Sequence, residues 1–278
     1  GLFPFLFNQK KYMVVLEGLG RIFSSRNIIY SIIRLLIIRI YKFIFSKSYN
    51  KIIVLNYIDF AYLLEEKISP LSKLNIIPGT GIDKRTFNLS NMKKYRKASK
   101  EKQNWISYVG RIDNDKGFYR FIASALYMIN NKSFTDHKFV MICPEGDIQN
   151  LPVGFINDLK NRGILLYPYV PDILVYYCNI KVIVIPTLYA EGLSRVALEA
   201  SLLSIPIVGT LNRGIVSVVK DNYSGILLQD SSSYMVSFAI EKILRNYDYF
   251  FENSVKHAPK IEEKYGIDIS LESLFNLI

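Results

Sequence analysis

Cysteine is scarce in this 278-residue chain, which has only two copies. Cys143 and Cys178 lie in separate apolar stretches, a pattern that makes neither a disulfide framework nor a zinc site. We also expect no signal peptide, because the opening "GLFPFLF" is too short for the hydrophobic region of such a peptide. These absences exclude a disulfide-stapled secreted domain and favour a reducing, cytoplasmic setting.

Acidic residues are outnumbered by basic ones. The chain has 35 Lys and Arg against 24 Asp and Glu, a formal net charge of +11. This balance favours an anionic partner, which can be a nucleic acid, a nucleotide or an anionic membrane surface. Charge alone supports the nucleic acid, since the sequence shows neither a recognition helix nor an aromatic–basic motif. We therefore expect no nucleic-acid partner.

The chain lacks a long apolar run free of charge. Its most apolar segment, residues 28–45, is long enough to raise the question of a membrane span, but it contains Arg34, Arg39 and Lys42. Each cation would be costly at the centre of a bilayer. Their spacing places them on roughly one side of a helix, so we expect an amphipathic basic helix. Two interpretations stay open: a core-packed helix with a solvated basic edge, or contact with an anionic membrane surface.

Strand and helix patterns alternate along the sequence in two groups. The first group has strands at 12–18, 50–56 and 74–83, with helices at 28–45 and 57–68. The second group has strands at 104–112, 138–144, 163–170, 181–186, 205–210 and 224–228, with helices at 117–131, 150–162, 171–179 and 231–246. Continuous apolar strands indicate parallel sheets covered by helices on both faces.

Two Rossmann-like α/β halves are therefore predicted. The polar, basic residues 88–103 show no apolar periodicity and predict a linker between them. Ligands of such sheets bind outside the carboxyl ends of the strands, and here also in the cleft between the halves.

The stretch "YAEGLSRVALEAS", residues 189–201, follows an apolar strand and opens a helix. Gly192 allows close approach of a ligand to the backbone, and the first amides of the helix, near Ser194, favour a phosphate. Glu191 and Glu199 suit hydroxyl groups on either side of that phosphate, such as a ribose and a hexose. The alternative is that Glu191 caps the helix and Glu199 is solvated.

A second constellation is "YVGRIDNDKG", residues 108–117, where a strand ends at Gly110. Arg111 and Lys116 follow, and two cations at this edge can hold a diphosphate and neutralise charge on a leaving group. Ordinary surface cations are the alternative. The "DND" at 113–115 resembles a metal-binding motif, but the adjacent cations would already do the work of a metal.

Six segments in this order resemble the donor half of a GT-B glycosyltransferase of the large retaining family 4. They are "VGRIDNDKG", "KFVMICPEGD", "YPYV", "PTLYAEGLSRVALEAS", "IPIVGT" and "SGILL". The two glutamates with seven residues between them are that family's hallmark. Upstream, "GLGRIFSS", "IIVLNYIDF" and "IIPGTGIDKRTF" resemble later segments of the acceptor domain in its bacterial surface-polysaccharide branch.

The resemblance implies metal-independent transfer of a hexose or N-acetylhexosamine, with retained configuration, from a nucleotide-sugar to a lipid-linked glycan. UDP is the nucleotide we expect, and no cofactor. Glu191 is the implied catalytic residue and would hold the donor sugar, while Glu199 would hold the ribose. The implied donor-binding set is Gly110, Arg111, Lys116, Glu145, Gly146, Tyr169, Val170, Glu191, Gly192, Leu193, Ser194 and Glu199. Peripheral contact with the inner face of the cell membrane also fits this branch.

Two departures from the family pattern shape the expected domains. The turn "LNRGI" at 211–215 has one glycine where relatives have a glycine-rich turn, and the resemblance starts after the acceptor domain's first strand and loop, so we expect an N-terminally truncated domain. We expect a partial acceptor-side domain and linker over 1–95, a donor-binding domain over 96–264 and a helix over 265–278 that crosses back. A truncated chain would bind the donor without turning it over. A non-catalytic nucleotide-sugar-binding protein is the alternative.

Overall fold

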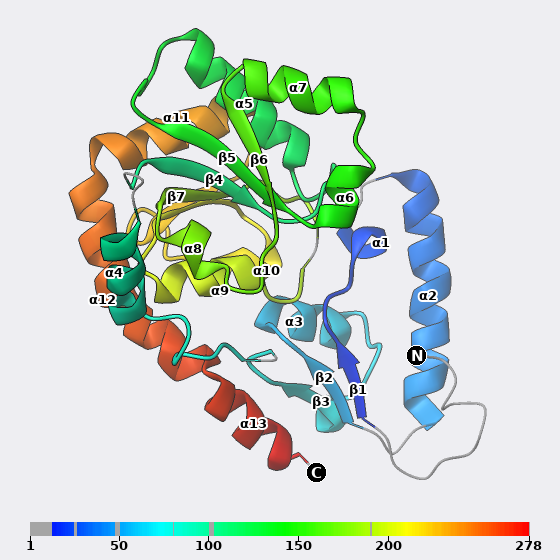
Figure 1. Ribbon diagram of the computed structural model, residues 1–278. Helices are drawn as coiled ribbons and strands as arrows, with labels where there is room; N and C mark the ends of the chain where they lie inside the picture. Colours follow the sequence, from blue (N-terminus) through cyan, green and yellow to red (C-terminus); the bar gives the residue numbers. More distant parts are fainter. Residues whose placement is uncertain are drawn as a thin grey trace.

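The computed structural model describes most of the chain. The described residues are 13–24, 27–47, 51–79, 81–99, 103–189 and 191–277. They form two parallel sheets, one above the other in Figure 1. The opening "GLFPFLF", which we expect to leave apolar surface uncovered, lies outside the described residues.

The first sheet has the order β1-β2-β3, with β1 at an edge. Its strands are β1 (Met13–Leu16), β2 (Lys51–Val54) and β3 (Leu74–Ile76). Its connections are α1 (Arg21–Ser24), α2 (Ile28–Lys47), α3 (Tyr57–Glu65) and a 3-10 turn at Leu71–Lys73. We call these elements the first domain.

The second sheet has the order β6-β5-β4-β7-β8-β9, and all its strands are parallel. The strands are β4 (Trp105–Val109), β5 (Lys138–Cys143), β6 (Ile164–Pro168), β7 (Ile180–Ile185), β8 (Ile207–Thr210) and β9 (Gly225–Leu228). The winding direction reverses between β4 and β7, which is where doubly wound sheets bind their ligands. We call this sheet and its helices the second domain.

Helices cover both faces of the second sheet, as the continuous apolar strands predicted (Figure 1). They are α5 (Phe118–Asn130), α6 (Glu145–Gln149), α7 (Val153–Asn161), α8 (Leu174–Tyr177), α9 (Arg195–Leu202), α10 (Arg213–Val216) and α11 (Ser233–Arg245). Alternate residues of β4 enter different cores: Ile106 and Tyr108 pack with α5 and α11, whereas Trp105 and Val109 pack on the side of α8 and α9. Because both faces of the sheet are covered by helices, its strands do not alternate apolar and polar residues.

The linker predicted at 88–103 is wrong over most of its length, because Leu89–Ala98 forms helix α4. Asn88 caps this helix, its side-chain oxygen accepting the amide of Asn91 at 2.8 Å. Met92 is fully buried in the second domain's core together with Ile82 and Phe87. Only Met92 and the partly buried Tyr95 pack on this core, which leaves little apolar periodicity in the sequence, and this packing assigns the segment to the second domain.

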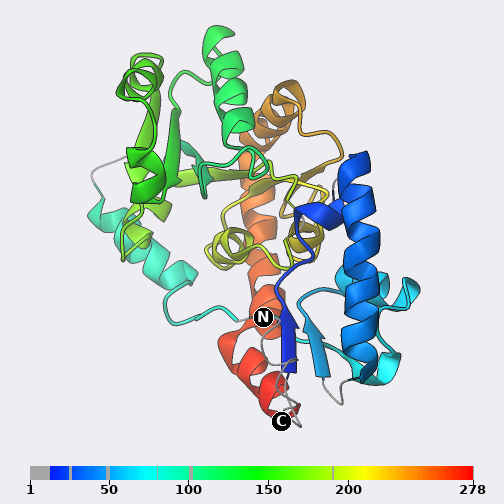
Figure 2. The same cartoon turned by 90° about the vertical axis from the view of Figure 1, so that its right-hand side faces the viewer.

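The C-terminal helices join the two domains. Helix α12 (Tyr247–Tyr265) packs on α9 of the second domain, and α13 (Ile267–Phe275) lies against the first sheet. Between them, the amide of Ile82 donates to the carbonyl of Tyr265 at 2.9 Å and that of Ile267 to Ile82 at 3.1 Å. Leu274 and Leu277 pack against the β2 and β3 ends, so α13 covers the face of the first sheet opposite α2 (Figure 2).

Helix α2 does not carry the single basic edge expected of residues 28–45, whereas contact with a membrane surface stays a prediction. Ile38 and Phe45 are buried against the first sheet, but the opposite side of the helix is apolar and exposed. That outer face consists of Ile28, Ile29, Ile32, Ile33, Leu35, Leu36, Ile40 and Phe43. The three cations do not form one basic edge, because the guanidinium of Arg34 donates inward to the carbonyl of Ile22 at 2.9 Å. Among the described residues, no helix combines the length and apolar character needed to cross a bilayer.

Candidate functional site

A cavity of about 320 Å³ opens at the point where the winding of the second sheet reverses. Its walls come from the carboxyl ends of β4 and β7 and from the loops that follow them. The lining residues are Tyr108, Val109, Gly110, Arg111, Lys116, Tyr169, Ile185, Thr187, Glu191, Leu193, Ser194, Arg195 and Val196. Seven of the twelve predicted site residues are among them, which places most of the predicted set around one space.

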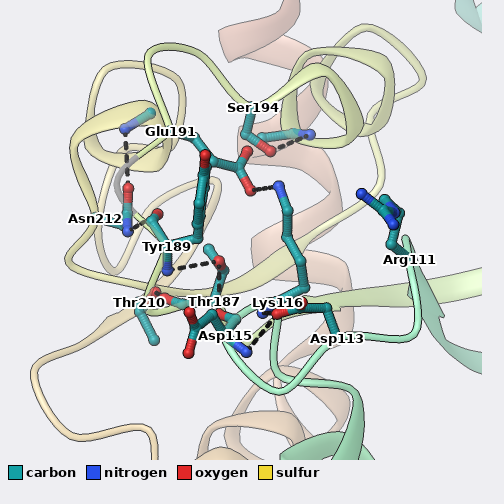
Figure 3. A network of polar contacts seen from close by, with 12 residues as sticks. Arg111, Asp113, Asp115, Lys116, Thr187, Tyr189, Glu191, Ser194, Thr210 and Asn212 are labelled. Atoms are coloured by element: carbon teal, nitrogen blue, oxygen red, sulfur yellow. Dashed lines mark hydrogen bonds and ion pairs between the residues drawn. The ribbon is translucent and has the colours of Figure 1, made fainter. Parts of the chain in front are cut away.

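Two loops are fastened together on one side of this cavity. The carbonyl of Asp115 accepts the amide of Leu188 at 2.7 Å and the hydroxyl of Thr187 at 3.1 Å. Gly117 has the left-handed φ of 88°, and a Cβ there would collide with the carbonyl of Pro186. The loop after β4 is thus fixed to the end of β7, so Lys116 projects from a rigid base (Figure 3).

Lys116 and Glu191 form an ion pair beside the cavity (Figure 3). The ammonium of Lys116 also lies 4.9 Å from the centre of the Tyr189 ring. Both side chains are largely withdrawn from solvent, which strengthens the attraction between them. Lys116 is therefore paired with a carboxylate beside the cavity, and it is not the ordinary surface cation that the alternative interpretation describes.

Arg111 is placed differently from Lys116. Its side chain is 74% exposed, and its Nε lies 3.6 Å from a carboxylate oxygen of Asp147, a residue outside the predicted set. The same oxygen of Asp147 accepts the amide of Ile112 at 3.0 Å. Asp147 thus holds the loop that carries Arg111 in place. The sequence indicated this role only through the position of Asp147 in the first turn of a helix.

Five predicted residues are outside the described lining, and three of them follow strands β5 and β6. Glu145 and Gly146 are exposed on α6, whereas their neighbour Asp147 reaches the site. Val170 is half-buried next to Tyr169, which does line the cavity. Desolvation raises the pKa of Tyr169 to about 12, so its hydroxyl stays neutral and can donate a hydrogen bond.

The turn Glu191–Ser194, which we call the acidic turn, corrects two expected roles. A Cβ on Gly192 would collide with the carbonyl of Glu17, so this glycine admits the first domain's backbone rather than a ligand. The amide of Ser194 donates to the carbonyl of Gly214 at 3.1 Å and is therefore taken. Leu193 lines the cavity and also packs with Ile53 of the first domain.

The first amides of α9, which the sequence predicted to favour a phosphate, belong to residues just after Ser194. Ser194 caps the helix by accepting the amide of Ala197 at 3.4 Å. The first amides of a helix have no acceptor within it, and Arg195 and Val196 at this end both line the cavity. Their amides and the helix dipole favour a negative charge here.

Glu199 is buried rather than solvated, and this overturns the alternative considered for it. It is 8% exposed, and its carboxylate accepts the hydroxyl of Tyr177 at 2.8 Å and the Nε of Arg195 at 2.9 Å. Burial and the Glu199 charge raise the pKa of Tyr177 well above its usual value, which keeps the phenol a donor. Glu199 lies behind Arg195, which itself lines the cavity.

The acidic residues of the "DND" segment shape the loop. One carboxylate oxygen of Asp113 accepts the amides of Asp115 at 2.7 Å and Lys116 at 3.3 Å, the pattern of a turn. Within the described ranges, no three His, Cys, Asp or Glu side chains gather where they could hold a metal ion. Metal-independence itself stays an expectation.

Comparison with solved structures identifies the architecture as GT-B. HepE from Anabaena, solved with UDP and glucose, superposes with a TM-score of 0.73 at 12% identity, over 95% of this chain and 70% of that one. Sucrose-phosphate synthase from Thermosynechococcus elongatus gives a TM-score of 0.75 at 18% identity, over 99% of this chain and 69% of that one. At such identities the likeness shows the fold alone.

The chain belongs to the family described as glycosyl transferases group 1, whose model matches residues 91–261. It is 28% identical over 221 residues to the capsular polysaccharide biosynthesis glycosyltransferase CapM of Staphylococcus aureus, covering 76% of this chain and 56% of CapM. It is 26% identical over 238 residues to an Escherichia coli UDP-Gal:alpha-D-GlcNAc-diphosphoundecaprenol alpha-1,3-galactosyltransferase, covering 79% of this chain and 61% of that enzyme. The chain thus spans less than two thirds of either relative.

Proposed function

We propose that the cavity binds a nucleotide-sugar and that the protein transfers its hexose or N-acetylhexosamine, with retained configuration, to a lipid-linked glycan in surface-polysaccharide synthesis. The observation that supports this most is that the Lys116–Glu191 ion pair and the start of α9 line the same cavity, at the point where the winding of the second sheet reverses. The cavity therefore has cations that can bind a diphosphate and a carboxylate that can bind sugar hydroxyl groups.

The cations are assigned to the donor diphosphate. Lys116 takes a phosphate oxygen in place of Glu191, and Arg111 closes over the exposed side of the diphosphate. The amides of Arg195 and Val196 contribute from the start of α9. Together they offset the negative charge that grows on the leaving nucleoside diphosphate as the sugar bond breaks, so no metal ion is required.

The carboxylates are assigned to hydroxyl groups. Glu191, released from Lys116 by the incoming phosphate, accepts hydroxyl hydrogens of the donor sugar and is the residue nearest the reaction. Glu199 serves the ribose, with its orientation fixed by Tyr177. Tyr169 and the backbone near Val170 face the base. This order along the cavity places the sugar toward the first domain, where the acceptor would approach.

A lipid-linked acceptor is supported by the relatives and by the surface of α2. The Escherichia coli relative is named for a diphosphoundecaprenol-linked acceptor. The exposed outer face of α2 carries eight large apolar side chains beside Arg39. An exposed apolar stripe flanked by cations is typical of helices that lie in the interfacial region of an anionic membrane. We therefore propose peripheral contact with the inner face of the cell membrane through α2.

Donor binding without transfer is the second candidate, and one observation favours it. Met13 and Val15 of β1 are exposed at the edge of the first sheet, and no described strand pairs with that edge. An acceptor wall with an open edge holds an acceptor poorly, and positioning can supply several kcal/mol of the barrier. Donor affinity would survive this loss because its contacts lie in the second domain.

Calorimetric titration with UDP, GDP and ADP, and then with UDP-sugars, tests the binding proposal. We expect one nucleotide to bind with a dissociation constant in the micromolar range, unchanged by EDTA. Absence of binding to every nucleotide would refute the proposal, and loss of binding with EDTA would restore a metal at Asp113 and Asp115. Transfer to a lipid-diphosphate glycan then separates the enzyme from the second candidate.

A further inference from the structure

A chain of buried polar contacts runs from the first domain to the acidic turn. The side-chain nitrogen of Asn56 donates to the carbonyl of Gly192 at 2.7 Å and to the Asp59 carboxylate at 2.8 Å. The other Asp59 oxygen accepts a guanidinium hydrogen of Arg213 at 2.5 Å. Asn56 and Asp59 are almost fully buried, at 3% and 1% exposed. The two domains are thus joined by buried hydrogen bonds, and the loss of these bonds is costly because no water can replace them.

The orientation of Asn56 is set by its own helix. Its side-chain oxygen accepts the amide of Asp59 at 2.7 Å and so caps α3. This fixes the amide plane, and the nitrogen can only point toward Gly192 and the Asp59 carboxylate. The cap therefore aims a donor at the acidic turn.

The acidic turn is gripped from the second domain as well. Asn212 donates to the carbonyl of Tyr189 (Figure 3). A Cβ on Gly214 would lie 3.1 Å from the backbone of Glu191, so α10 packs closely beneath the turn. Arg213 on the same short helix is the partner of Asp59. The position of Glu191 is therefore set jointly by both domains, and the nucleotide-facing residues Tyr169 and Glu199 make none of these described contacts.

We infer that Asn56 and Asp59 are positioning residues that hold Glu191 at the sugar end of the donor. This assignment rests on the proposed function for its ligand, but the mechanical coupling stands on the contacts alone. Asn56 fixes the carbonyl that follows Glu191, and Asp59 ties Asn56 to Arg213. The first domain thereby takes part in recognition of the donor sugar while the nucleotide is bound by the second domain.

Asn56→Ser is the decisive variant. Serine still caps a helix, so α3 keeps its start, but it lacks the amide nitrogen that reaches Gly192. Asn88→Ser is the matched control, because Asn88 caps α4 in the same way and makes no described contact with the acidic turn. Calorimetry would compare UDP with UDP-galactose and UDP-N-acetylglucosamine, and hydrogen–deuterium exchange would follow the amides of residues 191–196 in the unliganded full chain.

For Asn56→Ser we expect affinity for the UDP-sugar that binds to fall about threefold to tenfold, the range for one lost hydrogen bond, with UDP affinity unchanged. Exchange at 191–196 should rise by a similar factor, and Asn88→Ser should change neither. Equal losses for UDP and UDP-sugar would overturn the assignment to the sugar. Unchanged exchange would overturn the coupling, and this arm decides even if the wild-type chain binds no nucleotide.

Discussion

The two sheets differ in how much of their apolar surface the described chain covers. The second sheet is enclosed on both faces, and its strands are buried almost throughout. The first sheet has an exposed edge at β1, and its helix α2 turns an apolar face outward. Its fixed points are contacts with other parts of the molecule: α13, the Arg213–Asp59 pair and the close approach at Gly192. Each domain thus has a core, but that of the first domain is smaller, and the position of the first domain depends on its contacts with the second.

The largest effect should come from the second core. Ile183 on β7 is 0% exposed, whereas Ile32 on α2 is 65% exposed. We expect Ile183→Ala to lower the free energy of unfolding by about 3–5 kcal/mol, through lost burial and a cavity. Ile32→Ala should change it by less than about 0.5 kcal/mol. Urea denaturation measures both, and a comparable loss for Ile32→Ala would show that the outer face of α2 is covered.

The tie between the domains comes next. Arg213→Met leaves the Asp59 carboxylate buried without its cationic partner, which should cost about 3 kcal/mol. We expect the first domain to unfold at lower urea than the second. The single tryptophan, Trp105, reports on the second domain by fluorescence, while circular dichroism reports on both.

The control for that tie is Lys84→Met, which removes the exposed Lys84–Glu262 pair at 3.1 Å. Exposed pairs contribute little, so both transitions should shift by less than about 0.5 kcal/mol. Coincident fluorescence and circular dichroism transitions in Arg213→Met would mean that the two domains unfold as one unit without this ion pair.

The sequence was informative where the pattern within a single segment is enough to predict its structure. Continuous apolar strands predicted the second sheet, and the spacing of the two glutamates after β7 led to the acidic turn. The α4 helix was missed because only Met92 and the partly buried Tyr95 pack it against the core. The partners of the turn were missed for another reason: Asp59 and Arg213 are 154 residues apart, and no local pattern links them.

The same limit applied within the site. Arg111 and Lys116 were predicted as equivalent cations, and only the structure separates an exposed arginine from a lysine fixed beside Glu191. On α6 the prediction named Glu145 and Gly146, whereas Asp147 is the residue that reaches the site. The sequence of the first turn of a short helix does not reveal which side chain faces inward. Gly192 was read as space for a ligand, since a glycine gives no sign of which neighbour approaches it.

The cation variants separate the donor contacts by strength. We expect Lys116→Ala to weaken nucleoside-diphosphate binding by about 2–3 kcal/mol, because its ammonium is positioned and largely desolvated. Arg111→Ala should cost about 1 kcal/mol or less, since its side chain is mostly exposed. Lys160→Ala, on the exposed end of α7, is the control. Calorimetry with UDP decides, and unchanged affinity in both site variants would remove the diphosphate assignment.

Tyr177→Phe probes the nucleotide end alone. The variant keeps the buried ring but removes the hydroxyl that holds Glu199, leaving Arg195 as its described partner. We expect affinities for UDP and for the UDP-sugar to fall together by about 1–1.5 kcal/mol. This equal loss contrasts with the sugar-specific loss expected of Asn56→Ser. A loss confined to the UDP-sugar would place Glu199 at the sugar instead of the ribose.

The smallest effect concerns the outer face of α2, where a lipid surface would supply the cover that the described residues do not. Arg39 is exposed beside the apolar stripe, whereas Arg34 donates inward to Ile22. Arg39→Gln should therefore weaken partition into anionic vesicles by about 1 kcal/mol and leave neutral vesicles unaffected, because a cation near the surface gains only from anionic lipid. Arg34→Gln, the matched control, should change partition less. Leu36→Ser should weaken binding to both vesicle types, since apolar insertion does not depend on lipid charge. Co-sedimentation with the two vesicle types measures all three variants, and equal behaviour of Arg39→Gln and Arg34→Gln would mean that another surface of the protein meets the membrane.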